Sequence, residues 1–239
     1  MSLMRAHQQK IKGQGDQPVV KVGNAGPGGK GTLNKSQLMK LLDAGLSVVL
    51  AALHEMKSTA AKIEHKRTAL IPEYASYVTR LREKNWKHDL LPWYMLWLFD
   101  VGSIEAALDL GLYCIAAEIE MPERFARDVP TVMADSLIKW AEAEHAAERS
   151  PEPYFSTMFD FVAGTDETPP WNLPDQIAVK YFKLKAQLEQ KSGNLEAAKG
   201  YFEKALELGA TVKTVLKEIT KQVDDAKASE GDDTSEGEK

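Results

Sequence analysis

The sequence predicts an all-α fold: a long N-terminal heptad helix pair, then helical hairpins that resemble tetratricopeptide repeats, with disordered termini. Three observations support this prediction. Residues 39–70 follow an apolar heptad period, the apolar block 90–122 divides into two helices around a tight turn, and the residue pattern of that turn returns near residue 193. These periods and turn signals are those of helices.

The heptad pattern predicts one helix over residues 35–70, about 50 Å long at 1.5 Å per residue. Pro72 should interrupt it, and a second helix should cover residues 73–87. So long an apolar seam needs a partner, which is either the next helix of the same chain, packed antiparallel, or other copies of the chain. The candidate oligomerisation residues are Met39, Leu42, Leu46, Val49, Leu53, Met56 and Ile63.

The block 90–122 is the densest apolar stretch, but its uninterrupted apolar run ends at Asp100. That is short of the roughly 20 residues of a bilayer span. Gly102 and Ser103 then stop one helix and restart another. A second hairpin is predicted around Gly193, where Ala198 and Ala205 let two helices approach and Phe202 fills the groove. Two hairpins in one domain and a true repeat solenoid both stay open, because neither copy carries a full repeat signature.

Further helices are predicted up to residue 148 and after Pro153, with a loop at 164–170 and a new helix start at Pro174. The chain therefore divides into four predicted regions. They are a disordered basic arm (1–33), long helices for oligomerisation and DNA contact (34–89), a helical-hairpin domain (90–223) and a disordered acidic tail (224–239).

Charge is distributed unevenly along the chain, whose formal net charge is −5. Through residue 40 there are seven Lys or Arg and a single Asp, whereas from residue 224 onward there are seven Asp or Glu and two Lys. The first end suits phosphates and the other repels them. Residues 23–32 resemble a phosphate-binding loop only loosely, because no strand precedes them and Gly31 separates Lys30 from Thr32.

Basic side chains of the arm and of the first helices are candidates for DNA contact, which needs no strict spacing because phosphate charge is continuous. A merely solvated face is the alternative for the helical ones. The candidates are Arg5, Lys10, Lys12, Lys21, Lys30, Lys57, Lys62, Lys66, Arg67, Arg80, Arg82, Lys84 and Lys87.

Catalytic patterns are scarce in this sequence. The five His residues are scattered, and the single Cys114 is expected in the core with no catalytic partner. A two-metal nuclease needs converging carboxylates, and only folding could assemble Glu118, Glu120 and Glu123, or Asp160, Asp166 and Glu167. We therefore predict no metal site and no cofactor, and we lean against catalysis by the isolated chain. The absence of a secretory or membrane-length segment predicts a cytoplasmic protein without membrane contact.

Several short motifs, in order, resemble those of a known family. They are Leu90-Leu91-Pro92-Trp93, Leu96-Trp97, Asp100-Val101-Gly102-Ser103-Ile104-Glu105-Ala106-Ala107-Leu108, Met121-Pro122 followed by Pro130, and Gly193-Asn194-Leu195-Glu196-Ala197-Ala198. Over residues 40–222 the chain resembles the small terminase subunit, or endonuclease subunit, of temperate contractile-tailed phages. That family ends in a strongly basic tail, whereas this chain ends acidic, which shifts the expected DNA contact to the arm.

The resemblance implies a DNA-packaging protein of the infected bacterial host's cytoplasm. It would bind double-stranded phage DNA at the packaging site, form a homo-oligomer such as a ring, and direct a large ATPase subunit to cut and package. It also implies that this subunit carries the endonuclease label, although no nuclease pattern is visible. The alternative is a helical-repeat adaptor that binds proteins and not DNA.

Overall fold

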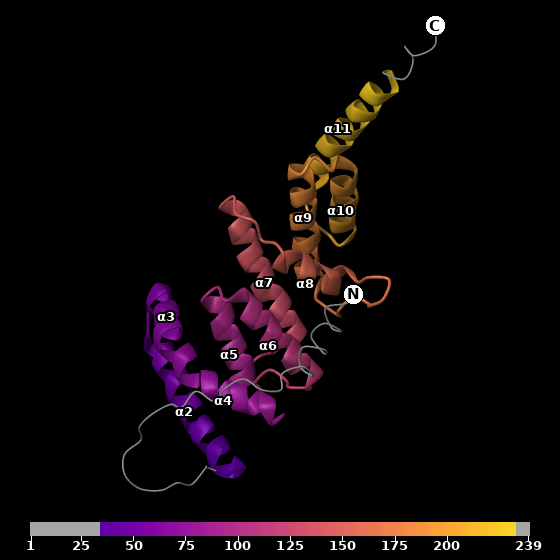
Figure 1. Ribbon diagram of the computed structural model, residues 1–239. Coiled ribbons are helices and arrows are strands. Elements are labelled where there is room, and N and C mark those ends of the chain that lie inside the picture. The colour runs from indigo at the N-terminus through magenta and orange to yellow at the C-terminus, as the bar shows by residue number, and fades with distance from the viewer. Residues whose placement is uncertain (1–33, 233–239) are drawn as a thin grey trace, which may run out of the picture. The chain divides into compact units, whose positions relative to one another are not determined.

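A computed structural model describes residues 34–232, which fold into helices arranged as two compact units, residues 34–129 and 130–232. The first unit contains α2 (Lys35–Glu55), α3 (Thr59–His65), the π-helical turn η1 (Lys66–Leu70), α4 (Ile71–Glu83), α5 (Leu90–Asp100) and α6 (Ile104–Ala116) (Figure 1). The second contains α7 (Val129–Ala146), α8 (Tyr154–Ala163), α9 (Asp175–Lys191), α10 (Leu195–Glu207) and α11 (Lys213–Asp232). The all-α prediction is confirmed for this part of the chain.

The predicted single helix over residues 35–70 is wrong, because the chain leaves the helix at Met56. Met56 is extended, with φ −69° and ψ 122°, and the Ser58 hydroxyl then accepts a hydrogen bond from the Ala61 N–H to cap α3. A capping residue thus ends a helix that the apolar spacing alone would continue. The returning helices pack against α2, where a Cβ placed on Gly45 would come within 3.1 Å of the Tyr74 hydroxyl oxygen.

The expected interruption at Pro72 takes a different form. Helical structure continues from Thr59 to Glu83, with a π turn immediately before the proline. Within this turn the Ile71 N–H donates to the Lys66 carbonyl, five residues back. Proline cannot donate to the carbonyl four residues back and its ring crowds it, so a locally wider turn accommodates the ring without ending the helix.

The boundary between the two units falls at Val129, not near residue 90. Contacts that join α5 and α6 to the preceding helices explain the difference. The Tyr94 hydroxyl donates to the Ile71 carbonyl at 2.9 Å, and the Tyr74 and Trp97 rings meet edge to face at 5.7 Å. Aromatic pairs and hydrogen bonds between residues far apart in sequence therefore make residues 34–129 one core.

The two predicted hairpin turns have matching geometry. Gly102 and Gly193 have φ of 79° and 83°, and the residues that follow them, Ser103 and Asn194, have φ/ψ of −81°/65° and −82°/65°. Ser103 N–H donates to the Leu98 carbonyl and Asn194 N–H to the Glu189 carbonyl, each at 2.9 Å. Both turns are Schellman motifs, which need a left-handed residue that glycine supplies most readily.

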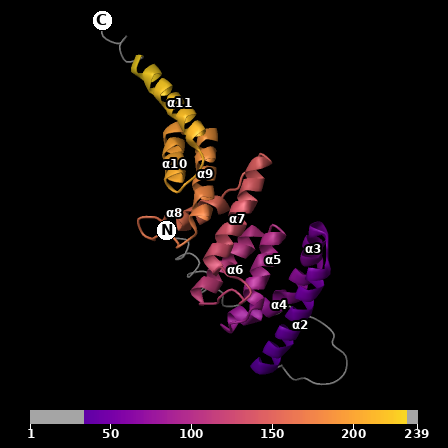
Figure 2. The same cartoon turned by 180° about the vertical axis from the view of Figure 1, so that it is seen from behind.

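In the second unit, α9 and α10 lie side by side and α11 packs on α10 (Figure 2). Ala198, Phe202 and Ala205 are buried between these helices, as the hairpin pattern predicts. Tyr181 is also buried; its hydroxyl donates to the Ala134 carbonyl at 2.9 Å, and its ring stacks on Phe155. Whether this hairpin is a tetratricopeptide repeat stays a prediction.

The helix α11 continues to Asp232, so residues 224–232, predicted to be disordered, are helical. Ala226 and Lys227 are good helix formers, and the Lys227 ammonium pairs with the Glu196 carboxylate on α10. This local contact gives the acidic segment a helical start that composition alone does not reveal. The rest of the predicted tail, and the arm 1–33, lie outside the described residues.

Among the described helices, α2 has the length and mean hydropathy that crossing a bilayer would require. Lys40, Asp43 and Ser47 interrupt its apolar residues, so the sequence shows no continuous apolar run of that length. The property is also shared by core helices of globular units, so it does not define a membrane protein.

Candidate nucleic-acid interface

The C-terminal end of α4 turns back toward the start of α2 through Asn85. This residue has φ 49°, its N–H donates to the Arg82 carbonyl, and the Trp86 N–H donates to the Leu81 carbonyl at 2.9 Å. Asparagine tolerates the left-handed region better than most residues with a side chain. The turn therefore brings Trp86 close to the first turn of α2.

Trp86 is half-buried, and two cations lie close to its ring. The Lys35 ammonium lies 5.4 Å and the Arg80 guanidinium 5.9 Å from the centroid of its ring. Cation–π attraction of this kind is worth about 0.5–1 kcal/mol at exposed sites. The ring therefore gathers positive charge contributed by two different helices.

Two more cations flank this ring in sequence. Lys84 is exposed, and Lys87 donates to the Glu118 backbone carbonyl at 2.9 Å while its side chain stays 59% exposed. We refer to Lys35, Arg80, Lys84, Trp86 and Lys87 as the Trp86 cluster. A partly exposed ring with two cations near its centroid and two more beside it in sequence is suited to contact with phosphates.

Contacts on both sides of the cluster hold it in place. Asn34 and Gln37 form a capping box at the start of α2, which positions Lys35. The buried His88 ring accepts a hydrogen bond from the Leu90 N–H at Nδ1, and its Nε2 lies 3.2 Å from the Asp43 carboxylate on α2. The linker after α4 therefore lies next to α2 at this point.

Three other predicted DNA-contact residues are engaged by carboxylates. Lys66 pairs with Asp100 at 2.5 Å, Arg67 with Glu64 at 2.8 Å and Arg82 with Asp109 at 2.7 Å. Lys66 is also largely buried, at 14% exposure. These side chains connect the first unit internally and are less available to phosphates than the sequence suggests.

The remaining helical candidates lie elsewhere. Lys57 belongs to the connection between α2 and α3 and Lys62 to α3, and within the described residues neither forms an ion pair. The arm candidates Arg5, Lys10, Lys12, Lys21 and Lys30 lie outside the described residues. The structure therefore brings Arg80 to the same ring as Lys35, and Lys84 and Lys87 flank that ring in sequence. Lys35 and Trp86 are residues that sequence reasoning missed.

The candidate oligomerisation residues divide by burial. Leu42, Leu46 and Leu53 are in the core of the first unit, whereas Met39, Val49, Met56 and Ile63 are half-buried. Their part in self-association stays a prediction.

The two carboxylate sets named from the sequence do not form a cluster. Across residues 34–232 no three His, Cys, Asp or Glu side chains come close enough together to hold a metal ion. Glu118 instead lies beside Lys87, at 3.8 Å.

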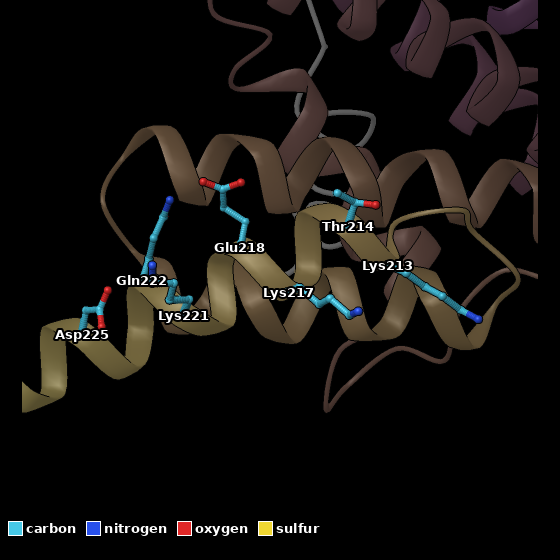
Figure 3. A pocket seen from close by; sticks show the side chains of 7 residues that line it. All are labelled: Lys213, Thr214, Lys217, Glu218, Lys221, Gln222 and Asp225. Atoms are coloured by element: carbon cyan, nitrogen blue, oxygen red, sulfur yellow. The ribbon is translucent and has the colours of Figure 1, made fainter.

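A second basic surface occurs on α11, where Lys213, Lys217 and Lys221 follow one another at helical spacing (Figure 3). Glu218 and Asp225 line the same shallow hollow, together with Thr214 and Gln222. The carboxylates offset most of the lysine charge, so this surface is a weaker candidate for phosphate contact than the Trp86 cluster.

These features define a class: an all-α protein of helical hairpins that carries a cationic aromatic cluster on its surface. The chain belongs to the phage small terminase subunit family, whose profile matches residues 44–176, more than half of its length. The resemblance stated from the short motifs is thereby confirmed.

Two relatives are similar over much of the chain. One is the probable terminase, endonuclease subunit, of Haemophilus phage HP1, 28% identical over 162 residues, which are 66% of this chain and 56% of the relative. The other is the terminase, endonuclease subunit, of Escherichia phage P2, 25% identical over 197 residues, 80% of this chain and 75% of the relative. The chain thus spans just over half the length of the HP1 protein. No solved structure matches the chain.

Proposed function

We propose that this chain is the DNA-recognising subunit of a phage packaging terminase in the cytoplasm of the infected bacterium. It binds double-stranded phage DNA, self-associates, and directs a large ATPase subunit to cut and package the genome. Family membership supports the packaging role. The Trp86 cluster is the observation that supports DNA contact, since it gathers cations from α2 and from the end of α4 around one ring.

The cutting step is assigned to the complex of this chain with its large subunit. Both relatives carry the words endonuclease subunit in their names. The proposal accommodates that label, because a subunit that selects the DNA site is required for cleavage whichever chain holds the nuclease residues.

A salt titration of duplex binding tests the DNA part of the proposal. The protein should bind a labelled duplex, and the logarithm of its affinity should fall linearly with the logarithm of salt concentration. The triple variant Lys35→Gln, Arg80→Gln, Lys84→Gln should bind more weakly, with a slope smaller by about 0.9 for each phosphate that the variant no longer neutralises.

The matched control removes the same charge from α9, by Lys180→Gln, Lys183→Gln and Lys191→Gln, and should leave the slope close to that of the unmodified protein. An equal decrease of affinity in both triple variants would show that only net charge matters. Absence of duplex binding at every salt concentration would contradict the proposal and favour the helical-repeat adaptor.

A further inference from the structure

The helix α2 is apolar on two sides. Leu38, Leu42 and Leu46 on its inner side are buried. On its outer side, Leu41 is 50% and Val48 69% exposed, and they are two of the three large apolar side chains that are exposed in the described part of the chain. Only 22% of the most apolar window of this helix is buried. A contiguous apolar face that stays exposed in a single copy is a candidate interaction surface.

The outer side has the spacing that a second helix requires. Leu41, Ala44, Val48 and Ala51 are all exposed and follow one another at intervals of three, four and three residues. This is the a/d pattern of a coiled-coil seam, and the alanines would let two helix backbones approach closely. We refer to these four residues as the outer α2 face. The face carries no cation of its own, so it does not suit DNA.

Charges at the two ends of the outer α2 face are complementary. Lys40 lies at its N-terminal end and Glu55 at its C-terminal end; both are exposed, and neither has an ion-pair partner among residues 34–232. An antiparallel pairing of two α2 helices brings Lys40 of each copy toward Glu55 of the other. A parallel pairing sets like charges together and aligns the helix dipoles unfavourably.

Within the first unit, α2 and α3 lie on one side of α5 and α6 in both views (Figures 1 and 2). We infer that a second copy of this chain docks antiparallel on the outer α2 face. The inference rests on the self-association included in the proposed function and adds the surface through which it occurs. That surface differs from the predicted heptad seam, whose Leu42, Leu46 and Leu53 already fill the core.

Light scattering during gel filtration of the full chain, over a range of concentrations, tests the inference. The double variant Leu41→Asp, Val48→Asp should fold, because both side chains are exposed in the single copy. Its dissociation constant for self-association should rise at least about 100-fold, because the variant places charges in an apolar contact. Val215→Asp is the matched control: it changes the third exposed large apolar residue and should leave self-association unchanged.

Charge reversal tests the antiparallel geometry. Lys40→Glu and Glu55→Lys should each weaken self-association, because like charges would then meet, and the two together should restore it. A pair of reversals that stays as weak as either single one would contradict the antiparallel contact.

Two further outcomes would overturn the inference. The first is an oligomer of unchanged size in the Leu41→Asp, Val48→Asp variant, which would leave DNA binding and self-association intact as proposals. The second is a chain that stays monomeric but floats with phosphatidylglycerol vesicles through Leu41 and Val48, which would make the face a membrane contact. Duplex binding measured on the same samples shows independently whether the proposed function stands.

Discussion

At the scale of single residues, the availability of each basic side chain matters more than the number of basic side chains. The sequence predicts Lys66, Arg67 and Arg82 as DNA contacts on the same grounds as Arg80 and Lys84. The structure places a carboxylate beside each of the first three. Lys84, in contrast, is exposed, and the Arg80 guanidinium lies 5.9 Å from the centroid of the Trp86 ring.

Lys66 offers a test of this distinction. Lys66→Gln should lower the melting temperature by a few degrees, since it removes the partner of Asp100 from a half-buried ion pair, at a cost of about 1 kcal/mol. Duplex affinity should change less than about twofold, because one screened, paired charge contributes little to counterion release. Thermal unfolding and duplex titration of this variant check both expectations. A decrease of affinity as large as that of Arg80→Gln would show that Lys66 contacts phosphates after all.

Cys114 provides a pH-dependent signal. Burial raises the pKa of its thiol to about 12, against about 8.5 in an unfolded chain. Between these values the folded state holds a proton that the unfolded state has released, so stability should fall as pH rises, by at most about 1.4 kcal/mol per pH unit. Below about pH 8 the thiol is protonated in both states, so this group causes no loss of stability there.

Urea unfolding at pH 8 and above pH 10 measures that effect. Cys114→Ala should be less stable at pH 8, because it leaves a small cavity, but should lose less stability on going to the higher pH. A variant that loses as much stability as the unmodified chain would assign the alkaline instability to other groups, such as Tyr181, whose pKa burial raises well above its ordinary value.

At the scale of elements, hairpins were predictable and helix lengths were not. At both Gly102 and Gly193 the glycine is followed by Ser or Asn, and the next helix has a Glu in its first turn. This pattern predicts the Schellman turn that the structure shows at both positions. The spacing of apolar residues does not predict the break at Met56, because a connection of three residues changes that spacing little. The capping residue Ser58, which lies within the predicted heptad pattern, is the residue that indicates a new helix start.

Two glycines of the second unit allow a matched test of this turn. Gly193 has φ 83° with open space around its Cβ position, whereas Gly200 lies within α10, also with open space. Gly193→Ala should destabilise the protein by about 1 kcal/mol, because alanine is strained in the left-handed region. Gly200→Ala should stabilise it by about 0.5–1 kcal/mol through helix propensity. Urea unfolding of both variants checks the opposite signs, and equal signs would refute this account of the turn.

At the scale of the whole molecule, the fold class could be predicted from local periods, but the unit boundary and the site could not. Lys35 and Trp86 come together only because the chain turns back after α2, at the Met56 connection. No local sequence pattern predicts that contact. The same holds for Tyr94 and Ile71, whose hydrogen bond joins α5 to the first helices. Contacts between distant residues depend on packing, which a single sequence leaves open.

Removal of residues 2–33 separates the contribution of the arm from that of the helices. Every buried apolar residue of the described part lies between Leu38 and Val223, and Asn34 caps α2 from outside the deleted segment. The shortened chain should therefore keep its helical content and melting temperature. Its duplex affinity at low salt should fall at least about tenfold, since Arg5, Lys10, Lys12, Lys21 and Lys30 are removed, and its salt slope should shrink. Circular dichroism and the duplex titration measure the two effects.

Unchanged affinity of the shortened chain would show that the Trp86 cluster, without the arm, accounts for phosphate contact. The deletion combined with Lys35→Gln, Arg80→Gln and Lys84→Gln should then abolish duplex binding.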